Sequence, residues 1–390
     1  MKILFFEIFT TLGEIAGGDA KQVCYLSEEF KKRGEQVEIL NLHFKDKLFI
    51  RDIKFMARFL TLSQRDIQTD VIFASGTPFW ALPTYFLKKK MKSPAVLYIT
   101  HCNNLRAKIV ETVGLSGIAW REGGHRLFFK SIINNFIFIF LVFPDLFKTP
   151  ALFRFSLRGL DKIIVSCEYI KRQICHLVDK DKVTVIYPLI ENKVKYDDVS
   201  EPSSFFTIFY FGAFYSGRGV IDLIYAFLKL KDKFSELRLV IAGYPKYEET
   251  SEMIVRSMVD KYDLKTRIDI HGYRMDVMEE LKKASVVSIP FHDGVLFQPP
   301  LTLLEAMRMG KCVISTDCGA VAEFIADGQT GFLVQKKDIN MLAGKIEYLI
   351  KNPEIVKIVG GNAKAAIEKK CNFQANSQKI KEILEEVLPK

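Results

Sequence analysis

Short apolar runs alternate with amphipathic segments along most of this chain, which is the pattern of parallel strands joined by crossover helices. The runs that predict buried strands in the first half are 3–9, 37–42, 70–74, 95–100, 162–166 and 183–187. Those of the second half are 207–211, 237–242, 268–271, 286–290 and 312–315. Helical spacing over 19–32 ends at Gly34, and a second helix is predicted over 220–231. The chain is therefore expected to fold from β-loop-α-β units.

Length and composition favour two domains. A chain of 390 residues is long enough for two domains of roughly 150–200 residues each. Its 49% hydrophobic and 26% charged residues can build sizeable cores. The polar stretch 188–204 is the best interdomain linker. We expect one domain over 1–190, a second over 205–370, and a last segment, 371–390, that forms a helix.

The net charge limits the kinds of binding partner, and the cysteine content indicates the redox state of the compartment. The net charge of +10 implies an acidic partner, which could be nucleic acid, anionic lipid or a diphosphate-bearing substrate. Seven cysteines without a C-x-x-C pair favour buried thiols in a reducing compartment. The N-terminal apolar run is soon followed by Glu7 and Glu14, so it predicts a first strand rather than a signal peptide.

Two segments raise the question of a membrane. Residues 127–147 are rich in Phe and Ile, but their uninterrupted apolar part, 136–143, is far shorter than the roughly 20 residues of a spanning helix. This part is either a buried helix or one that enters a membrane interface. The lysines between 88 and 92 are either a solvated helix end or a cationic patch that faces anionic lipid.

Two ionisable residues stand where chemistry is plausible. Glu305 lies inside an apolar helical run, where a carboxylate is costly unless a partner pairs with it; the alternative is a surface position. His101 follows a predicted strand, at the edge where ligands bind in open α/β sheets, although a lone histidine is often structural.

Glycine-containing loops are the other candidates. Gly17 and Gly18 precede a predicted helix, whose N-terminal N–H groups could bind a phosphate, although any turn can use a Gly-Gly pair. Gly319 and Ala320 open a short predicted helix, 320–326, and could donate N–H groups in the same way.

Residues 303–334, LLEAMRMGKCVISTDCGAVAEFIADGQTGFLV, resemble the nucleotide-sugar-binding segment of GT-B glycosyltransferases, in particular the retaining family 4. Residues 17–40, GGDAKQVCYLSEEFKKRGEQVEIL, resemble the first loop and helix of that family. The resemblance covers nearly the whole chain. It implies an α/β GT-B fold, with two doubly wound Rossmann-like domains that face each other across a cleft, and a final helix that packs back across both.

The resemblance also implies roles for individual residues. Glu305 would hold the nucleotide ribose, Arg218 the donor diphosphate, and His101 the donor sugar and phosphate. These three are the expected catalytic residues, with no metal ion. The expected donor-binding residues are Gly17, Gly18, Gly212, Gly219, Gly272, Tyr273, Asp293, Gln298, Leu301, Thr302, Gly319 and Ala320.

Two positions depart from the family pattern. Ala213 stands where the family commonly has a diphosphate-binding Arg, while Arg218 replaces a Lys and keeps its charge. Phe297 stands where a carboxylate usually reaches the donor sugar, and a phenyl ring cannot accept those hydrogen bonds. Asp293, Gln298 or backbone amides could replace it, or the donor could be unusual.

The implied function is transfer of a sugar from a nucleotide-diphosphate donor, with retention, to a glycan or lipid-linked acceptor. The nucleotide sugar would be a co-substrate and no other cofactor is expected. Asp179 and Asp181 form a D-x-D that we interpret as solvent-facing rather than metal-binding. The expected location is cytoplasmic, with a peripheral contact to the inner membrane face as one alternative.

Three rival functions remain open. A sugar-nucleotide epimerase or hydrolase on the same fold would need acid and base carboxylates in the cleft. A non-catalytic binding protein would explain Ala213 and Phe297. The case for nucleic-acid binding is the weakest of the three, because the sequence shows no recognised nucleic-acid-binding module.

Overall fold

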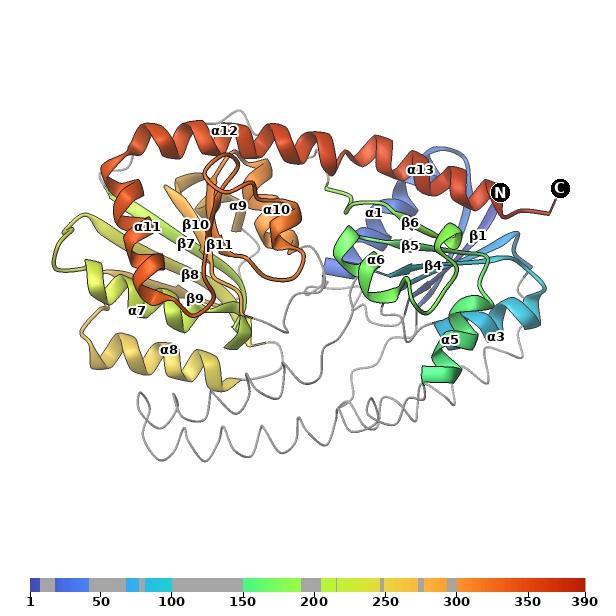
Figure 1. Ribbon diagram of the computed structural model, residues 1–390, viewed down its shortest axis with the longest axis horizontal. Helices are drawn as coiled ribbons and strands as arrows, with labels where there is room; N and C mark the ends of the chain where they lie inside the picture. Colours follow the sequence, from blue (N-terminus) through green and yellow to red (C-terminus); the bar gives the residue numbers. More distant parts are fainter. Residues whose placement is uncertain are drawn as a thin grey trace. The chain divides into compact units, whose positions relative to one another are not determined.

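The computed structural model describes residues 1–7, 18–41, 68–76, 81–99, 150–190, 205–214, 216–245, 249–272, 277–292 and 300–389. They form two compact units, each built on a parallel six-stranded sheet with helices packed against it (Figure 1). The first unit includes the chain from Cys371 onward, and the second contains Lys193–Lys370.

The sheet of the first unit has the strand order β2-β1-β3-β4-β5-β6. Its strands are β1 (Lys2–Glu7), β2 (Gln36–Asn41), β3 (Val71–Gly76), β4 (Ala95–Ile99), β5 (Lys162–Val165) and β6 (Val183–Val185). Its helices are α1 (Gly18–Lys32), α3 (Ala81–Met91), α5 (Pro150–Arg158), α6 (Glu168–Ile174) and α13 (Phe373–Glu386), with a 3-10 turn at η2 (Lys180–Lys182). As predicted, Asp179 and Asp181 lie in an exposed turn before a strand.

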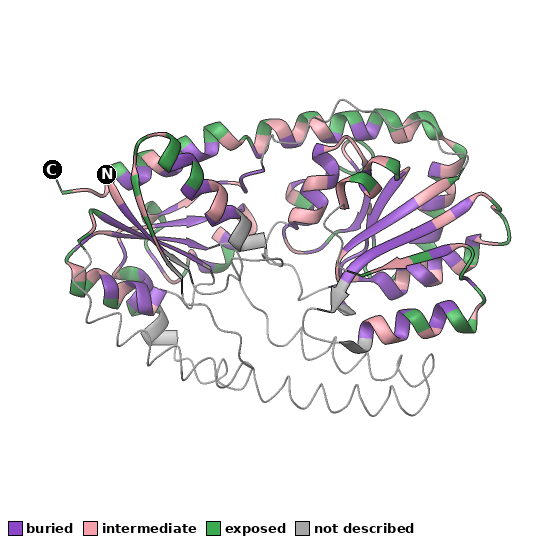
Figure 2. Ribbon diagram, turned by 180° about the vertical axis from the view of Figure 1, so that it is seen from behind, coloured by how far each residue is buried: buried purple, intermediate pink, exposed green. Residues whose placement is uncertain are grey.

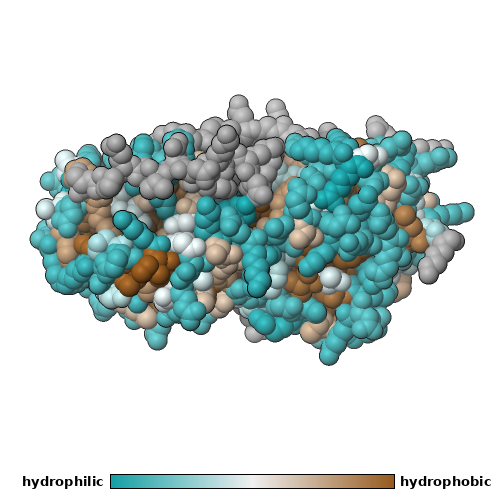
Figure 3. Space-filling model, turned by 90° about the horizontal axis from the view of Figure 1, so that it is seen from above, coloured by the Kyte–Doolittle hydropathy of each residue, from teal (hydrophilic) through white to brown (hydrophobic). Residues whose placement is uncertain are grey.

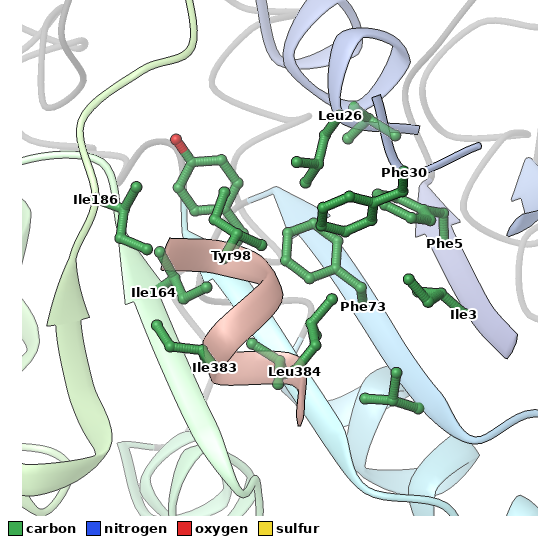
Figure 4. Close-up of a cluster of buried hydrophobic side chains, with 14 of the residues drawn as sticks. Ile3, Phe5, Leu26, Phe30, Phe73, Tyr98, Ile164, Ile186, Ile383 and Leu384 are labelled. Carbon is green, nitrogen blue, oxygen red and sulfur yellow. The ribbon is translucent and has the colours of Figure 1, made fainter. Parts of the chain in front are cut away.

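One hydrophobic cluster fills the space between the first sheet, α1 and α13 (Figure 4). Phe73 on β3 packs against Phe5 on β1 and Tyr98 on β4, with ring centroids 5.1 and 6.1 Å apart. Ile383 and Leu384 of α13 enter the same cluster, which is why the C-terminal helix belongs to the core of this unit. Packing of this helix across both domains stays a prediction.

Glu35, between α1 and β2, pairs with groups from both ends of the chain. Its carboxylate forms ion pairs with the Met1 amino group at 2.8 Å and with Lys381 of α13 at 2.7 Å. Lys381, and then the N-terminus, hydrogen-bond to the carboxylate and hold the pKa of Glu35 below its ordinary value. The same contact raises the pKa of Lys381.

This contact predicts a pH dependence of stability. Because the pKa of Glu35 is depressed in the folded chain, its contribution is present above the pKa of an unfolded Glu and is lost as pH falls through the folded value. Urea titrations at neutral pH and at about pH 3 should therefore show a smaller acid-induced loss of unfolding free energy in Glu35→Gln than in the parent. Equal losses in the two chains would contradict this role for Glu35.

The sheet of the second unit has the strand order β12-β11-β10-β7-β8-β9. Its strands are β7 (Phe206–Phe214), β8 (Leu237–Pro245), β9 (Ile268–His271), β10 (Val286–Ile289), β11 (Cys312–Thr316) and β12 (Phe332–Val334). Its helices are α7 (Val220–Leu230), α8 (Glu249–Lys261), α9 (Val277–Lys283), α10 (Leu301–Arg308), α11 (Ile339–Lys351) and α12 (Pro353–Lys370), with 3-10 turns at η3 (Ser216–Arg218) and η4 (Val321–Glu323). Figure 2 shows that the strands are mostly buried, and Figure 3, which looks down on α12, shows a largely hydrophilic surface.

The winding direction of the second sheet reverses between β7 and β10. The chain proceeds from β7 outward to β8 and β9, and then returns to place β10 on the other side of β7. Open α/β sheets bind ligands beyond the carboxyl ends of the strands at such a switch point. The segments that follow β7 and β10 are therefore the first place to look for a site.

Three sequence predictions need correction. Strands β7 and β8 are longer than predicted, because Gly212 and Gly243 pair in register instead of starting loops, and a Cβ on Gly243 would lie only 2.4 Å from the Gly212 carbonyl oxygen. The helix predicted over 320–326 is only the single 3-10 turn η4. The predicted linker begins inside the first unit, where Leu189 is buried and exchanges hydrogen bonds of 2.7 and 2.6 Å with Gln22.

The cysteines of the described residues are free thiols, and Cys167, Cys312, Cys318 and Cys371 are buried. No described helix is long and apolar enough to cross a bilayer. Residues 127–147 lie outside the described residues.

Candidate functional site

Arg218 lies at the switch point of the second sheet, where the turn η3 joins β7 to α7. Its guanidinium carbon is 5.4 Å from the ring centroid of Phe291, which follows β10. Its Nη2 is 3.5 Å from the hydroxyl of Thr302, in the first turn of α10. Three elements that are distant in sequence therefore position one cation at the carboxyl edge of the sheet.

Gly212 leaves space for the Arg218 side chain, and Gly219 lets the backbone pass close to Pro290. Gly212 has a φ of +133°, and a Cβ there would lie 1.7 Å from Nη1 of Arg218. Gly219 has a φ of +70°, and its Cβ would lie 1.9 Å from the carbonyl oxygen of Pro290. Only glycine allows both the backbone conformation and these close approaches. Gly212, one of the expected donor-binding residues, therefore leaves the space that the guanidinium occupies, and Gly219 sets the path of the backbone that follows it.

Tyr210 lies beneath this loop, fully buried on β7, and donates a hydrogen bond of 3.0 Å to the Ala213 carbonyl oxygen. Burial raises the pKa of its phenol to about 12, an effect that the hydrogen-bonded Arg218 opposes. The phenol is therefore neutral at physiological pH and leaves the guanidinium charge uncancelled. Among the described residues, no carboxylate forms an ion pair with Arg218, so this charge is suited to an anionic ligand.

His292 and Asp222 connect the end of β10 to the start of α7. The imidazole Nε2 of His292 lies 2.7 Å from a carboxylate oxygen of Asp222. The backbone N–H of His292 donates a hydrogen bond of 2.8 Å to the Gly217 carbonyl oxygen. These contacts hold the residue before Arg218. The sequence reading assigned no role to either side chain, although His292 follows a buried strand just as His101 does.

The end of β11 is joined to the same edge. The hydroxyl of Thr316 donates to the Phe291 carbonyl oxygen, and that of Ser315 donates to the Ile289 carbonyl oxygen at 2.8 Å. Gly319, with a φ of +55°, and the buried Ala320 follow directly. The predicted Gly319-Ala320 turn therefore leaves the sheet beside the segment that carries Phe291.

Helix α10 presents the other predicted residues of this site. Leu301, Thr302 and Glu305 are half-buried, and Glu305 lies one turn after Thr302 on the same face of the helix. The helix is followed by Gly310, whose φ of +69° suits a left-handed helix end. Gly272, after β9, has open space where a side chain would be, and its role as a donor-binding residue stays a prediction.

The structure thus brings together Gly212, Arg218, Gly219 and Thr302, and places Glu305 on the adjacent turn. Gly18 begins α1 in the other unit. The predicted residues Gly17, His101, Tyr273, Asp293 and Gln298, like Phe297, lie outside the described residues. The described part of the chain contains no group of three or more His, Cys, Asp or Glu side chains that could hold a metal ion.

The tie between His292 and Asp222 can be tested directly. His292→Ala leaves a half-buried carboxylate without this partner, so the free energy of unfolding should fall by roughly 1–3 kcal/mol. Affinity for the expected nucleoside diphosphate donor should fall too, because the segment whose backbone N–H holds Gly217 loses its side-chain contact with α7. Urea unfolding and titration calorimetry measure the two effects. His176→Ala, at an exposed position in the first unit, is the control, and His292→Ala behaving like this control would contradict the tie.

Comparison with known proteins identifies the class of this site. Residues 194–366, which contain Arg218 and the described residues around it, match the family described as "Glycosyl transferases group 1". This match confirms the sequence resemblance to group 1 glycosyltransferases. The comparisons do not assign family 4.

Individual relatives agree with this class. The chain is 29% identical over 174 residues to a trehalose synthase of Pyrococcus horikoshii, covering 43% of this chain and 40% of that protein. It is 27% identical over 247 residues to the uncharacterized glycosyltransferase MJ1178 of Methanocaldococcus jannaschii, covering 63% of this chain and 66% of that protein. Both alignments therefore span less than two thirds of the relatives' own length.

A solved structure supports the fold of the whole chain. Anabaena HepE, solved in complex with UDP and glucose, superposes with a TM-score of 0.67 at 16% identity, covering 99% of both chains. The predicted α/β GT-B fold class is confirmed.

Proposed function

We propose that this chain transfers a sugar from a nucleoside diphosphate donor to a glycan or lipid-linked acceptor. The observation that supports the proposal most strongly is the position of Arg218, which lies between Gly212 and Gly219 at the switch point of the second sheet. This part of the chain matches the group 1 glycosyltransferases. In the reaction, the bond between the anomeric carbon and the diphosphate oxygen breaks, and the diphosphate leaves with the electron pair. The acceptor oxygen bonds to the same carbon and gives up its proton.

Arg218 would act on the leaving group. Its guanidinium can hydrogen-bond to the diphosphate, and the phenol of Tyr210 does not cancel its charge. Because the loop and Phe291 hold the guanidinium in place, little reorganisation is needed as negative charge develops on the diphosphate oxygen. A fixed cation of this kind could serve without a metal ion, and this metal independence is part of the proposal.

The remaining roles follow the family resemblance. We propose that Glu305 binds the ribose hydroxyls, that His101 contacts the donor sugar and phosphate, and that the sugar keeps its anomeric configuration. Glu305 is well placed for its role in one respect, since it lies one helical turn beyond the Thr302 that contacts Arg218. A ribose bound there would leave the diphosphate next to the guanidinium.

Glu305→Gln tests the ribose assignment. The amide keeps the shape of the side chain but loses the charge, so nucleoside diphosphate affinity should fall by about 1–2 kcal/mol, or roughly five- to thirtyfold. Binding of inorganic diphosphate, which has no ribose, should remain as in the parent. Calorimetric titration with both ligands makes the distinction. Equal losses for both ligands would contradict the ribose role and indicate a general disturbance of α10.

A second candidate is a non-catalytic protein that binds nucleotide sugars. It is favoured by Ala213, which lies half-buried within β7 where the family commonly has an Arg. Incubation with the bound nucleotide sugar, followed by NMR of the anomeric proton, separates the candidates. Transfer or slow donor hydrolysis supports the enzyme, and the configuration of the transferred sugar tests retention. An intact donor after prolonged incubation with a panel of acceptors supports the binding protein.

A further inference from the structure

Helices α3 and α5 lie side by side at one edge of the first unit and are joined by aromatic side chains (Figure 1). The ring of Tyr85 packs edge-on against Phe155 of α5, with centroids 5.2 Å apart, and its neighbour Phe86 lies at 6.1 Å. Gly159 permits this contact, because a Cβ there would lie 2.4 Å from the Tyr85 ring. Phe86 and Phe155 nevertheless remain 53% and 57% exposed.

Cations surround these two phenyl rings. Neither α3 nor α5 contains an Asp or Glu. Lys88 is committed to the fold, since it bonds to Asp161 at 2.7 Å and to the Gly159 carbonyl oxygen at 3.0 Å. The other cations on the two helices are exposed, and with the two rings they form what we call the aromatic–cationic face: Phe86, Lys89, Lys90, Arg154, Phe155 and Arg158.

The spacing places these groups together. Lys89 and Lys90 follow Phe86 by three and four positions, so they share its side of α3. Arg158 stands in the same relation to Phe155 and Arg154 on α5. The Lys89 ammonium lies 5.6 Å from the Tyr85 ring centroid, which links the cations to the aromatic cluster.

We infer that the aromatic–cationic face binds the surface of a membrane that contains anionic lipids. Phenyl rings that project from a helix surface can enter the headgroup region, while lysine and arginine side chains extend to the lipid phosphates. Each cation near such a surface contributes about 1 kcal/mol, roughly a fivefold gain in binding. The inference rests on the proposed function in one respect, because a lipid-linked acceptor would be presented at this surface.

The test is sedimentation of the full-length protein with two kinds of vesicle, phosphatidylcholine alone and phosphatidylcholine mixed with phosphatidylglycerol. The parent should bind the mixed vesicles and not the neutral ones. Phe86→Ser with Phe155→Ser should weaken this binding at least about tenfold, through lost apolar burial. Lys89→Ala with Lys90→Ala should weaken it by roughly fivefold per lysine.

A matched control is available on α12, where Lys357 and Ile358 are an exposed cation and an exposed apolar side chain outside the proposed face. Lys357→Ala with Ile358→Ser should leave vesicle binding unchanged. Failure of the parent to bind mixed vesicles would overturn the inference, as would equal binding by all variants. Preferential binding of single-stranded DNA, with the same loss in the variants, would overturn it in favour of a nucleic-acid surface.

Further measurements keep the outcomes apart. Thermal unfolding shows whether the phenylalanine variant is folded. If it is not folded, vesicle binding by the lysine variant tests the inference. Titration with nucleoside diphosphate should give the parental affinity in both variants, because the face lies outside the Arg218 site. Vesicle binding without nucleotide binding would support this inference and contradict the proposed function. Nucleotide binding without vesicle binding would support the proposed function and contradict this inference.

Discussion

Replacing Arg218 by Ala is expected to raise the Kd for the donor nucleoside diphosphate by roughly 10- to 150-fold, which corresponds to about 1.5–3 kcal/mol for a charge-assisted hydrogen bond. The loss should be large because the guanidinium is held in place before a ligand arrives. Phe291 lies 5.4 Å from it, and Gly212 leaves it the space that a Cβ would fill. Titration calorimetry on the folded variant measures the change.

A matched control exists in the same unit. Arg238, at the start of β8, holds its guanidinium 4.2 Å from the ring centroid of Phe205, as Arg218 does above Phe291. It lies at the opposite edge of the sheet, so Arg238→Ala should leave nucleotide affinity unchanged. Arg218→Lys should recover part of the affinity, because it keeps the charge but not the planar fork of donors. If Arg218→Ala bound the nucleoside diphosphate with the parental affinity, Arg218 would not be a donor-binding residue.

Replacing Gly219 by Ala is expected to lower both the stability of the second unit and its nucleotide affinity. A left-handed conformation costs a residue with a Cβ roughly 1–2 kcal/mol, and the φ of Gly219 is +70°. The added methyl would also stand 1.9 Å from the Pro290 carbonyl oxygen, so the backbone after β10 must move. We expect the free energy of unfolding to fall by at least about 2 kcal/mol. Urea unfolding followed by circular dichroism tests this expectation.

The control for Gly219 is a glycine without steric demands. Gly344 lies within α11, and nothing lies within 4 Å of the position that its Cβ would take. Gly344→Ala should leave nucleotide binding intact and raise stability by up to about 1 kcal/mol, since alanine favours a helix. If Gly219→Ala unfolded like the parent, the loop would be adaptable, and the account of a preorganised cation would be wrong.

Much of the architecture could be predicted from the sequence, because buried parallel strands appear as continuous apolar runs. The strands near 95–100, 268–271 and 286–290 were located to within about one residue of the structure. The predicted strand ends were wrong where a glycine could either end a strand or continue it. Gly212 was read as the start of a loop, yet it continues β7 because it pairs with another glycine, Gly243.

The site was predictable only in part, for a similar reason. Arg218, Thr302 and Glu305 could be identified from a family resemblance carried by short segments. The roles of Phe291, His292 and Asp222 depend on β7 and β10 being neighbours in the sheet, although His292 and Asp222 are 70 residues apart in the sequence. Contacts of this kind arise from strand order, which local sequence patterns do not specify.

The most direct test of the central claim is a nucleotide screen by thermal unfolding, with the parent protein, Arg218→Ala and Arg238→Ala side by side. A ligand that binds only the folded chain must raise its melting temperature. The account predicts that UDP, GDP or ADP, or a sugar derivative of one of them, stabilises the parent and Arg238→Ala, and that this shift is lost in Arg218→Ala. No shift with any nucleotide in a folded parent, or an equal shift in all three proteins, would contradict it.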